Sequence, residues 1–163
     1  ETAGGETVAM IMQNRATPEP RSFIGEGKVQ EMKELIAMNK SGEISFKAVK
    51  SYNLDEYYPI SPDNDQSYRY FMNDNLFDHI NIDKANTYVA KGTGDLKKNL
   101  KEFNDILDKT DIRIQVLGVG PDGHLGFNEP GETLYDGAHE EVLDDSTIEA
   151  NKRFFEKEED VLR

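Results

Sequence analysis

The sequence predicts an α/β domain: a Rossmann-like open sheet, mainly parallel, with helices on both faces. Segments with apolar residues at helical spacing alternate along the chain with short apolar runs typical of strands. The 163 residues suit a single domain, 1–163, with a core of its own. The hydrophobic share is 36% and the mean hydropathy is −0.72, so that core must be small, although apolar residues occur along the whole length.

The first part of the chain contains two expected helices and one expected strand. Residues 5–14, "GETVAMIMQN", have apolar side chains at helical spacing, which predicts a short helix. A longer helix is predicted over "GKVQEMKELIAMNKS", and Gly42 is a suitable stop. Residues 46–54 alternate apolar and polar side chains, as a strand does.

The second part continues the alternation of helix and strand. Residues 61–80 open with turn residues and are expected to become a helix, and residues 86–90 are expected to form a brief strand. A strongly periodic helix is predicted over 95–109, followed by a mostly buried strand in "DIRIQVLGVG". A short strand in "HEEVL" and a final helix in "DDSTIEANKRFFEKEED" complete the expected order.

Charge and cysteine content exclude several classes of function. The net charge of −13 argues against a protein that binds nucleic acid or docks on an anionic membrane, because both need Lys and Arg. The chain has no cysteine, which excludes disulfides, zinc–thiolate sites and thiol nucleophiles and agrees with a cytoplasmic location. No apolar stretch approaches membrane-spanning length. An anionic ligand must therefore be held by a local pocket whose attraction exceeds the repulsion from the protein's overall negative charge.

Two loops have the position of ligand sites, which in open α/β sheets lie beyond the carboxyl ends of strands. "NLDEYYP" follows the strand at 46–54 and carries Asp55 and Glu56. "GVGPDGHLGFNEPG" follows the apolar run "IRIQVL" and carries His124. If both strands are central and parallel, Asp55 and His124 face the same crevice. The alternatives are that the Asp–Glu pair forms a turn or a helix N-cap, and that the glycines serve backbone geometry.

His124 is the histidine whose neighbours favour catalysis. Asp122 lies two residues before it and Glu129 five residues after it. A carboxylate that accepts from one imidazole nitrogen fixes the tautomer and leaves the other nitrogen for proton transfer. His79 is instead expected at a helix surface or in the core, and His139 is expected to be exposed.

Five segments together resemble the glucosamine-6-phosphate deaminase family in order and separation: "NLDEY", "SYRYFM", "LFDHINID", "GVGPDGHLGFNEPG" and "NKRFF". The resemblance covers about residues 30–157. The related 6-phosphogluconolactonases share a Gly-Pro-Asp-Gly-His-like loop, but "GFNEP" is not expected after it. The resemblance implies that glucosamine 6-phosphate, a small phosphorylated amino sugar, is converted to fructose 6-phosphate and ammonia without a metal or a cofactor.

The resemblance also implies roles for single residues. His124, supported by Asp122 and Glu129, moves the proton that opens the pyranose ring. Asp55 takes the C2 proton and relays it to C1, giving an enolamine that loses ammonia, while Glu56 is expected to be structural. The residues expected to contact the substrate are Gly120, Gly123, Arg153 and Lys28. Arg153 matches a family arginine on the sugar phosphate; a solvated helix arginine is the alternative.

Three features depart from the family's phosphate site. The family has a strand and a Gly-Ser/Gly-Thr-Pro loop just before the helix at 28–40. Here that place reads "RSFIGEGKVQEM". Gly25 and Gly27 remain, but the loop's Ser/Thr hydroxyls and its proline are absent, and Glu26 is added. Lys28 compensates only in part for the lost donors. A family serine after "NEPG" is replaced by Glu132 or Thr133, and "LYDGAHEEVL" is acidic where the family's lid is basic. All three changes weaken anion binding.

The chain is also expected to be truncated relative to the family, without the family's first strand and without a later strand, helices and a distant lysine. A sheet that lacks strands exposes apolar surface and unpaired edges. One alternative function is therefore a catalytically impaired fragment, or an engineered or divergent relative, that serves as a scaffold or sugar-binding module and forms homo-oligomers through such edges. A second is a lactonase-like hydrolase in which His124 activates water.

Overall fold

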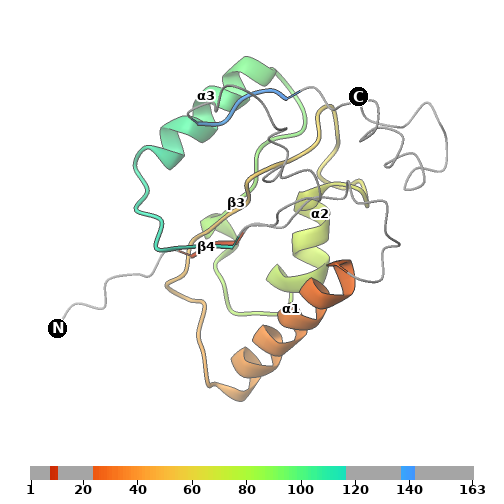
Figure 1. Cartoon of the computed structure of the whole chain (residues 1–163), viewed down its shortest axis with the longest axis vertical. Helices are drawn as coiled ribbons and strands as arrows, with labels where there is room; N and C mark the ends of the chain where they lie inside the picture. The colour runs from red at the N-terminus through yellow and green to blue at the C-terminus, as the bar shows by residue number, and fades with distance from the viewer. Residues whose placement is uncertain (1–7, 11–23, 117–136, 142–163) are drawn as a thin grey trace.

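The computed structural model describes residues 8–10, 24–116 and 137–141, which are coloured in Figure 1. Within these residues the helix α3 lies on one side of the strands, and α1 and α2 lie on the other (Figure 1). Helices therefore cover both faces of a sheet, as the sequence predicts for this α/β fold. In the described ranges no helix combines the length and the apolarity that crossing a membrane requires.

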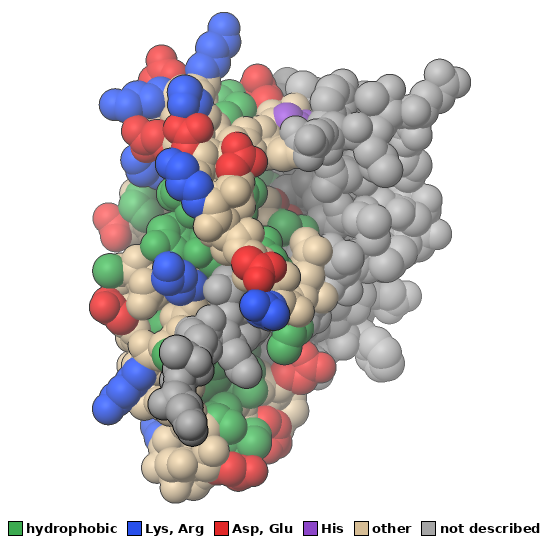
Figure 2. All heavy atoms as spheres, turned by 90° about the vertical axis from the view of Figure 1, so that its left-hand side faces the viewer, with side chains coloured by type: hydrophobic (Ala, Val, Ile, Leu, Met, Phe, Trp, Pro, Cys, Tyr) green, Lys and Arg blue, Asp and Glu red, His purple; other side chains and the backbone are tan. Residues whose placement is uncertain are grey.

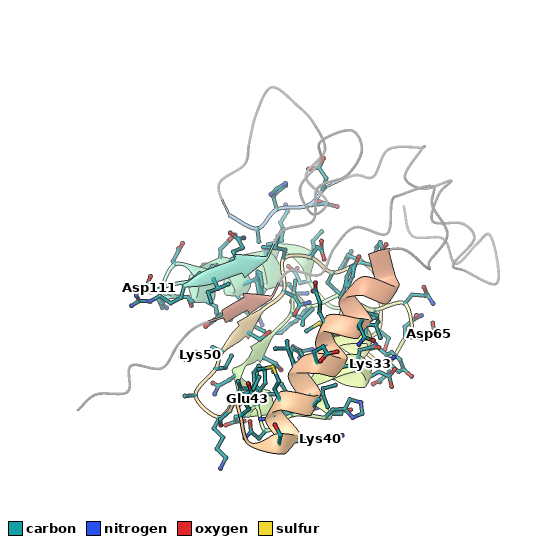
Figure 3. All side chains as sticks on the ribbon, turned by 60° about the horizontal axis from the view of Figure 1, so that its bottom comes forward. Lys33, Lys40, Glu43, Lys50, Asp65 and Asp111 are labelled. Atoms are coloured by element: carbon teal, nitrogen blue, oxygen red, sulfur yellow. The ribbon has the colours of Figure 1, made fainter. Side chains whose placement is uncertain are left out.

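The described residues contain four short strands in two parallel pairs. β1 (Val8–Met10) pairs with β4 (Ile114–Val116), and β2 (Ser51–Tyr52) pairs with β3 (Thr87–Tyr88). β1 also contacts β2, so the strands lie side by side in the order β4, β1, β2, β3 (Figure 3). The expected mainly parallel sheet is confirmed.

The helix α1 (Ile24–Ser41) matches the long helix expected near the start of the chain. The helix ends at Ser41, and Gly42 follows with a φ of +81°, the left-handed conformation that glycine adopts without steric cost. Met32 of α1 is 1% exposed and belongs to the larger hydrophobic core. The other buried members of that core are Met72, Leu76, Phe77 and Ile82. Burial of each such side chain stabilises the fold by roughly 1.5–3 kcal/mol.

Residues 61–80 open with turns and become helical at Tyr68, as expected. α2 (Tyr68–Met72) continues directly into a π-helical turn at Asn73–Phe77. The N-cap of α2 is Ser67, whose hydroxyl accepts a hydrogen bond from the backbone N–H of Tyr70. A smaller core lies at this end of the helix and consists of Tyr57, Ile60, Tyr68 and Val89.

The strongly periodic helix is α3 (Leu96–Leu107), as expected. Its N-cap is Asp95, which accepts from the backbone N–H of Lys98 at 2.8 Å. Phe103 is the buried residue of its inner face. On the outer face basic and acidic side chains alternate (Figure 2), and Lys101 and Asp105 form an ion pair of 2.6 Å one helical turn apart.

Several expected elements are wrong. Residues 8–10 form a strand and not part of a helix, because "VAM" pairs with β4, and this tertiary pairing overrides the local spacing. The strand expected over 46–54 is confined to Ser51–Tyr52, since the backbone N–H of Val49 turns back onto the carbonyl of Phe46. No strand begins at 139–141 within the described residues.

The apolar segment before the Gly-rich loop is not mostly buried. Ile112 is 37% exposed and Ile114 is 56% exposed. β4 lies at the end of the strand order in the described part of the chain, so its partner there lies on one side only. The expectation of a buried central strand at this position is therefore wrong for the described residues.

Candidate active site

The two loops singled out in the sequence start from strands of one parallel arrangement. β4 ends at Val116, opposite Met10 of β1, and the Gly-rich loop follows directly. β1 is joined to β2 through α1, the kind of connection that links parallel strands. β2 ends at Tyr52, three residues before Asp55. Carboxyl ends of parallel strands meet at one edge of a sheet, which is where open α/β sheets bind ligands.

Asp55 is the only expected catalytic residue that the structure describes, and it is partly buried. Lys28 belongs to α1, but its side chain is not described. The remaining expected site residues lie outside the described residues: Asp122, His124, Glu129, Gly120, Gly123 and Arg153. Their roles stay predictions.

Glu56, next to Asp55, binds the N-terminus of α2 with both carboxylate oxygens. Oε1 accepts from the backbone N–H groups of Tyr57 at 3.0 Å and Tyr68 at 2.9 Å. Oε2 accepts from the hydroxyl of Ser67 at 2.8 Å and from the backbone N–H of Arg69 at 3.0 Å. The first N–H groups of a helix have no partner within the helix, so an acceptor there stabilises it. The structural role expected for Glu56 has this physical basis.

Arg69 extends the same network from α2 to β3. Its guanidinium donates to the hydroxyl of Thr87 through Nη1 and to the carbonyl of Thr87 through Nη2, both at 2.9 Å. Burial lowers the pKa of Arg69, and the negative charge of Glu56 opposes that shift. Sequence reasoning did not single out Arg69 or Ser67, although a serine before an apolar run is a signal of a helix start.

One face of β2 carries polar side chains into the interior. Alternation along the extended chain puts Ser51 and Asn53 on the same side. The side chains of Ser51 and Asn53 are buried, and within the described part of the chain neither the hydroxyl nor the amide has a hydrogen-bond partner. On the opposite side Tyr52 stacks on Tyr88 with ring centroids 4.7 Å apart. The strand that leads to Asp55 thus has one aromatic and one polar face.

A pocket of about 300 Å³ lies between the Glu56–Arg69 network and α3. Its lining includes Glu56, Arg69, Thr87 and Phe103. Lys91 also lines the pocket and is paired with Glu102 at 2.6 Å, so this cation is already neutralised. The pocket therefore has no excess of positive charge among its described residues with which to hold a phosphate.

The two described histidines lie away from Asp55 in the sequence and have local partners. His79 is exposed, and its Nε2 lies 2.7 Å from the carbonyl of Asp74. The expectation that His139 is exposed is wrong. Its side chain is only 23% exposed and lies 3.2 Å from the carboxylate of Glu141. The cause is Asn104 of α3, whose amide donates to the carbonyl of Ala138 at 2.9 Å and accepts from its N–H at 2.6 Å. This double contact holds the segment against the helix.

Comparison with family models gives one match, to a family described as GTP-binding GTPase N-terminal, over residues 1–50. The matched region covers less than half of the chain and ends before β2. It contains no G-x-x-x-x-G-K-S/T pattern, the loop with which many GTP-binding proteins hold phosphates, since Gly27–Lys28 is followed by Val29. This match does not show a family for the chain.

Comparison with curated proteins and solved structures gives matches across most of the chain. A glucosamine-6-phosphate deaminase of Clostridium perfringens strain 13 is 54% identical over 80% of this chain and 55% of the relative. One of Halothermothrix orenii is 38% identical over 95% of this chain and 67% of the relative. A solved structure described as a monomeric glucosamine-6-phosphate deaminase of the NagB superfamily has a TM-score of 0.80 at 30% identity, over 96% of this chain and 62% of the other. The chain thus spans little more than half the length of the Clostridium relative.

Proposed function

The chain belongs to the glucosamine-6-phosphate deaminase family, and we propose that it converts glucosamine 6-phosphate and water to fructose 6-phosphate and ammonia. The proposal is supported by the position of Asp55, partly buried directly beyond β2, which lies between β1 and β3. A carboxylate that is shielded from water in part, at the ligand-binding edge of a sheet, suits a general base. The names of the relatives supply the substrate.

In the proposed reaction Asp55 acts on the open-chain sugar. Its carboxylate takes the proton from C2 while the C1 oxygen gains a proton, which gives an enolamine. The Asp55 carboxyl then gives this proton to C1, which leaves a protonated imine at C2. Water adds to that imine, ammonia leaves, and the ketone of fructose 6-phosphate remains. Water enters and ammonia leaves without any net oxidation or reduction of the sugar, so this chemistry requires no redox cofactor.

The other roles that the resemblance implies are part of the proposal. His124, with Asp122 and Glu129, opens the pyranose ring by moving a proton between the ring oxygen and the C1 hydroxyl. Arg153, Lys28 and the backbone at Gly120 and Gly123 are proposed to contact the substrate. A metal ion has no part in this scheme.

The proposal is tested by measuring ammonia release by the 163-residue chain with glucosamine 6-phosphate at millimolar concentration. We expect Asp55→Asn to lower kcat by about 10²- to 10⁴-fold, because the amide has the shape of the carboxylate and cannot take the proton. Asp63→Asn is the matched control, since it makes the same chemical change in an exposed loop. No ammonia from the unsubstituted chain would refute the proposal.

Two further measurements separate the alternatives. A ligand that binds only the folded chain must raise its melting temperature, so a rise with glucosamine 6-phosphate but no ammonia would indicate a sugar-binding module. Hydrolysis of 6-phosphogluconolactone would indicate a lactonase.

We also propose a cytoplasmic location, which the absence of cysteine supports. Self-association stays a prediction, which the molar mass measured by light scattering tests. The solved relative is described as monomeric.

A further inference from the structure

We infer that Glu56 is a positioning residue, whose carboxylate, held by the N-terminus of α2, sets the direction of the adjacent Asp55 carboxylate toward the C2 proton. This inference rests on the proposed function. It assigns Glu56 an effect on turnover in addition to its effect on stability.

The first support is the saturation of the Glu56 carboxylate. An ionised carboxylate has about four acceptor sites, and this one accepts two hydrogen bonds on each oxygen. Three of the four donors are backbone N–H groups, which cannot rotate away as a side chain can. The Glu56 side chain therefore has one orientation, and the backbone at residues 56–57 is fixed with it through the N–H of Tyr57.

The second support is an anchor on the other side of Asp55. The backbone N–H of Asn53 donates to the carbonyl of Tyr88 in β3 at 2.8 Å. Only Leu54 and Asp55 lie between this anchor and Glu56. A span of two residues between two fixed points leaves the backbone of Asp55 little freedom.

The third support is that both anchors are connected by hydrogen bonds to the same strand, β3. Asn53 is bonded to Tyr88, and Arg69 of α2 is bonded to the neighbouring Thr87. Glu56 in turn accepts from the backbone N–H of Arg69. The turn with Asp55 is thus part of a closed frame of β2, β3 and α2, and Glu56 is the member of that frame next to Asp55.

Glu56→Gln breaks the frame with the smallest change in shape. The amide keeps one acceptor oxygen and gains an NH₂ group, and whichever way it turns, that group faces a backbone N–H. At least one of the N–H groups of Tyr57, Tyr68 and Arg69 then loses its acceptor, and the turn must shift. A shift of about 1 Å in a catalytic group lowers turnover by up to about 10²-fold.

The experiment compares Glu56→Gln with the unsubstituted chain, at a temperature well below the melting point of each. We expect kcat to fall by about 10- to 100-fold with KM unchanged. The exchange of deuterium from C2 of the substrate into water should slow by the same factor, because that step is the one assigned to Asp55. Asp95→Ala is the control: it removes the N-cap of α3 and should lower the melting temperature without changing kcat.

The outcomes separate the inference from the proposed function. If the unsubstituted chain releases no ammonia and exchanges no C2 deuterium, the proposed function fails. If that chain is active and folded Glu56→Gln has the same kcat, only the inference fails, and Glu56 is a helix cap alone. Should Glu56→Gln not fold, Ser67→Ala removes one of the four hydrogen bonds. A several-fold lower kcat then supports the inference, and an unchanged kcat overturns it.

Discussion

Arg69 ties α2 to β3 by donating two hydrogen bonds of 2.9 Å to a single residue, Thr87. The fork of the guanidinium makes this possible, because two of its N–H groups reach the hydroxyl and the carbonyl together. Ser51 is the register partner of Thr87 across the sheet, so the contact ends next to β2. The helix that binds Glu56 is thereby fixed to the strand pair that leads to Asp55.

Replacing Arg69 with methionine should destabilise the fold. The substitution removes both donors and leaves the carbonyl of Thr87 without this partner, at a site that is partly buried. We expect the free energy of unfolding to fall by about 1–3 kcal/mol in urea titrations. Arg113→Met is the control, because Arg113 forms an exposed ion pair with Asp111 and its loss should cost at most about 0.5 kcal/mol. Equal effects of the two substitutions would contradict a special role for Arg69.

The sequence predicts those parts of the fold and site that depend on local pattern. α3 has strong helical periodicity, α1 carries apolar residues at helical spacing, and the stop at Gly42 is a local signal. Asp55 and Glu56 could be assigned to the end of a strand, and Glu56 to a structural role, for the same reason. β1 could not be recognised, because "VAM" is too short to alternate and becomes a strand only beside β4. The Arg69–Thr87 contact joins residues 18 positions apart and has no signature in either segment.

Two buried serines should respond in opposite ways to replacement by alanine. The Ser51 hydroxyl is buried and, among the described residues, has no hydrogen-bond partner. Removing an unsatisfied hydroxyl relieves a desolvation cost, so Ser51→Ala should leave the free energy of unfolding unchanged or raise it by about 1 kcal/mol. Ser67 is also buried, but its hydroxyl donates to Glu56 and accepts from Tyr70. Ser67→Ala should therefore lower the free energy of unfolding by about 1–2 kcal/mol.

Denaturant unfolding of both variants, followed by circular dichroism, measures this difference. The two substitutions remove the same atom from buried positions, so each is the matched control of the other. A loss of stability in Ser51→Ala as large as that in Ser67→Ala would show that the Ser51 hydroxyl has a partner in the folded protein.

Gly92 allows the segment after β3 to approach the segment after Asp55. Its carbonyl accepts from the backbone N–H of Ile60 at 2.7 Å. A Cβ at residue 92 would lie 2.5 Å from the carbonyl oxygen of Ile60 and 2.7 Å from that of Tyr57, and it would also collide with the side chain of Ile60. Backbone atoms cannot yield as a flexible side chain can, so the two segments must separate.

We therefore expect Gly92→Ala to lower the free energy of unfolding by about 2–3 kcal/mol and to lower kcat, since the displaced segment begins two residues after Asp55. Gly42→Ala is the control: its φ of +81° is unfavourable for alanine, but nothing lies within 4 Å of the added atom. That substitution should cost about 1 kcal/mol and leave kcat unchanged. Thermal melts and the ammonia assay measure both effects. A fully active Gly92→Ala would mean that the turn with Asp55 tolerates displacement, which would count against the frame around Asp55 as well.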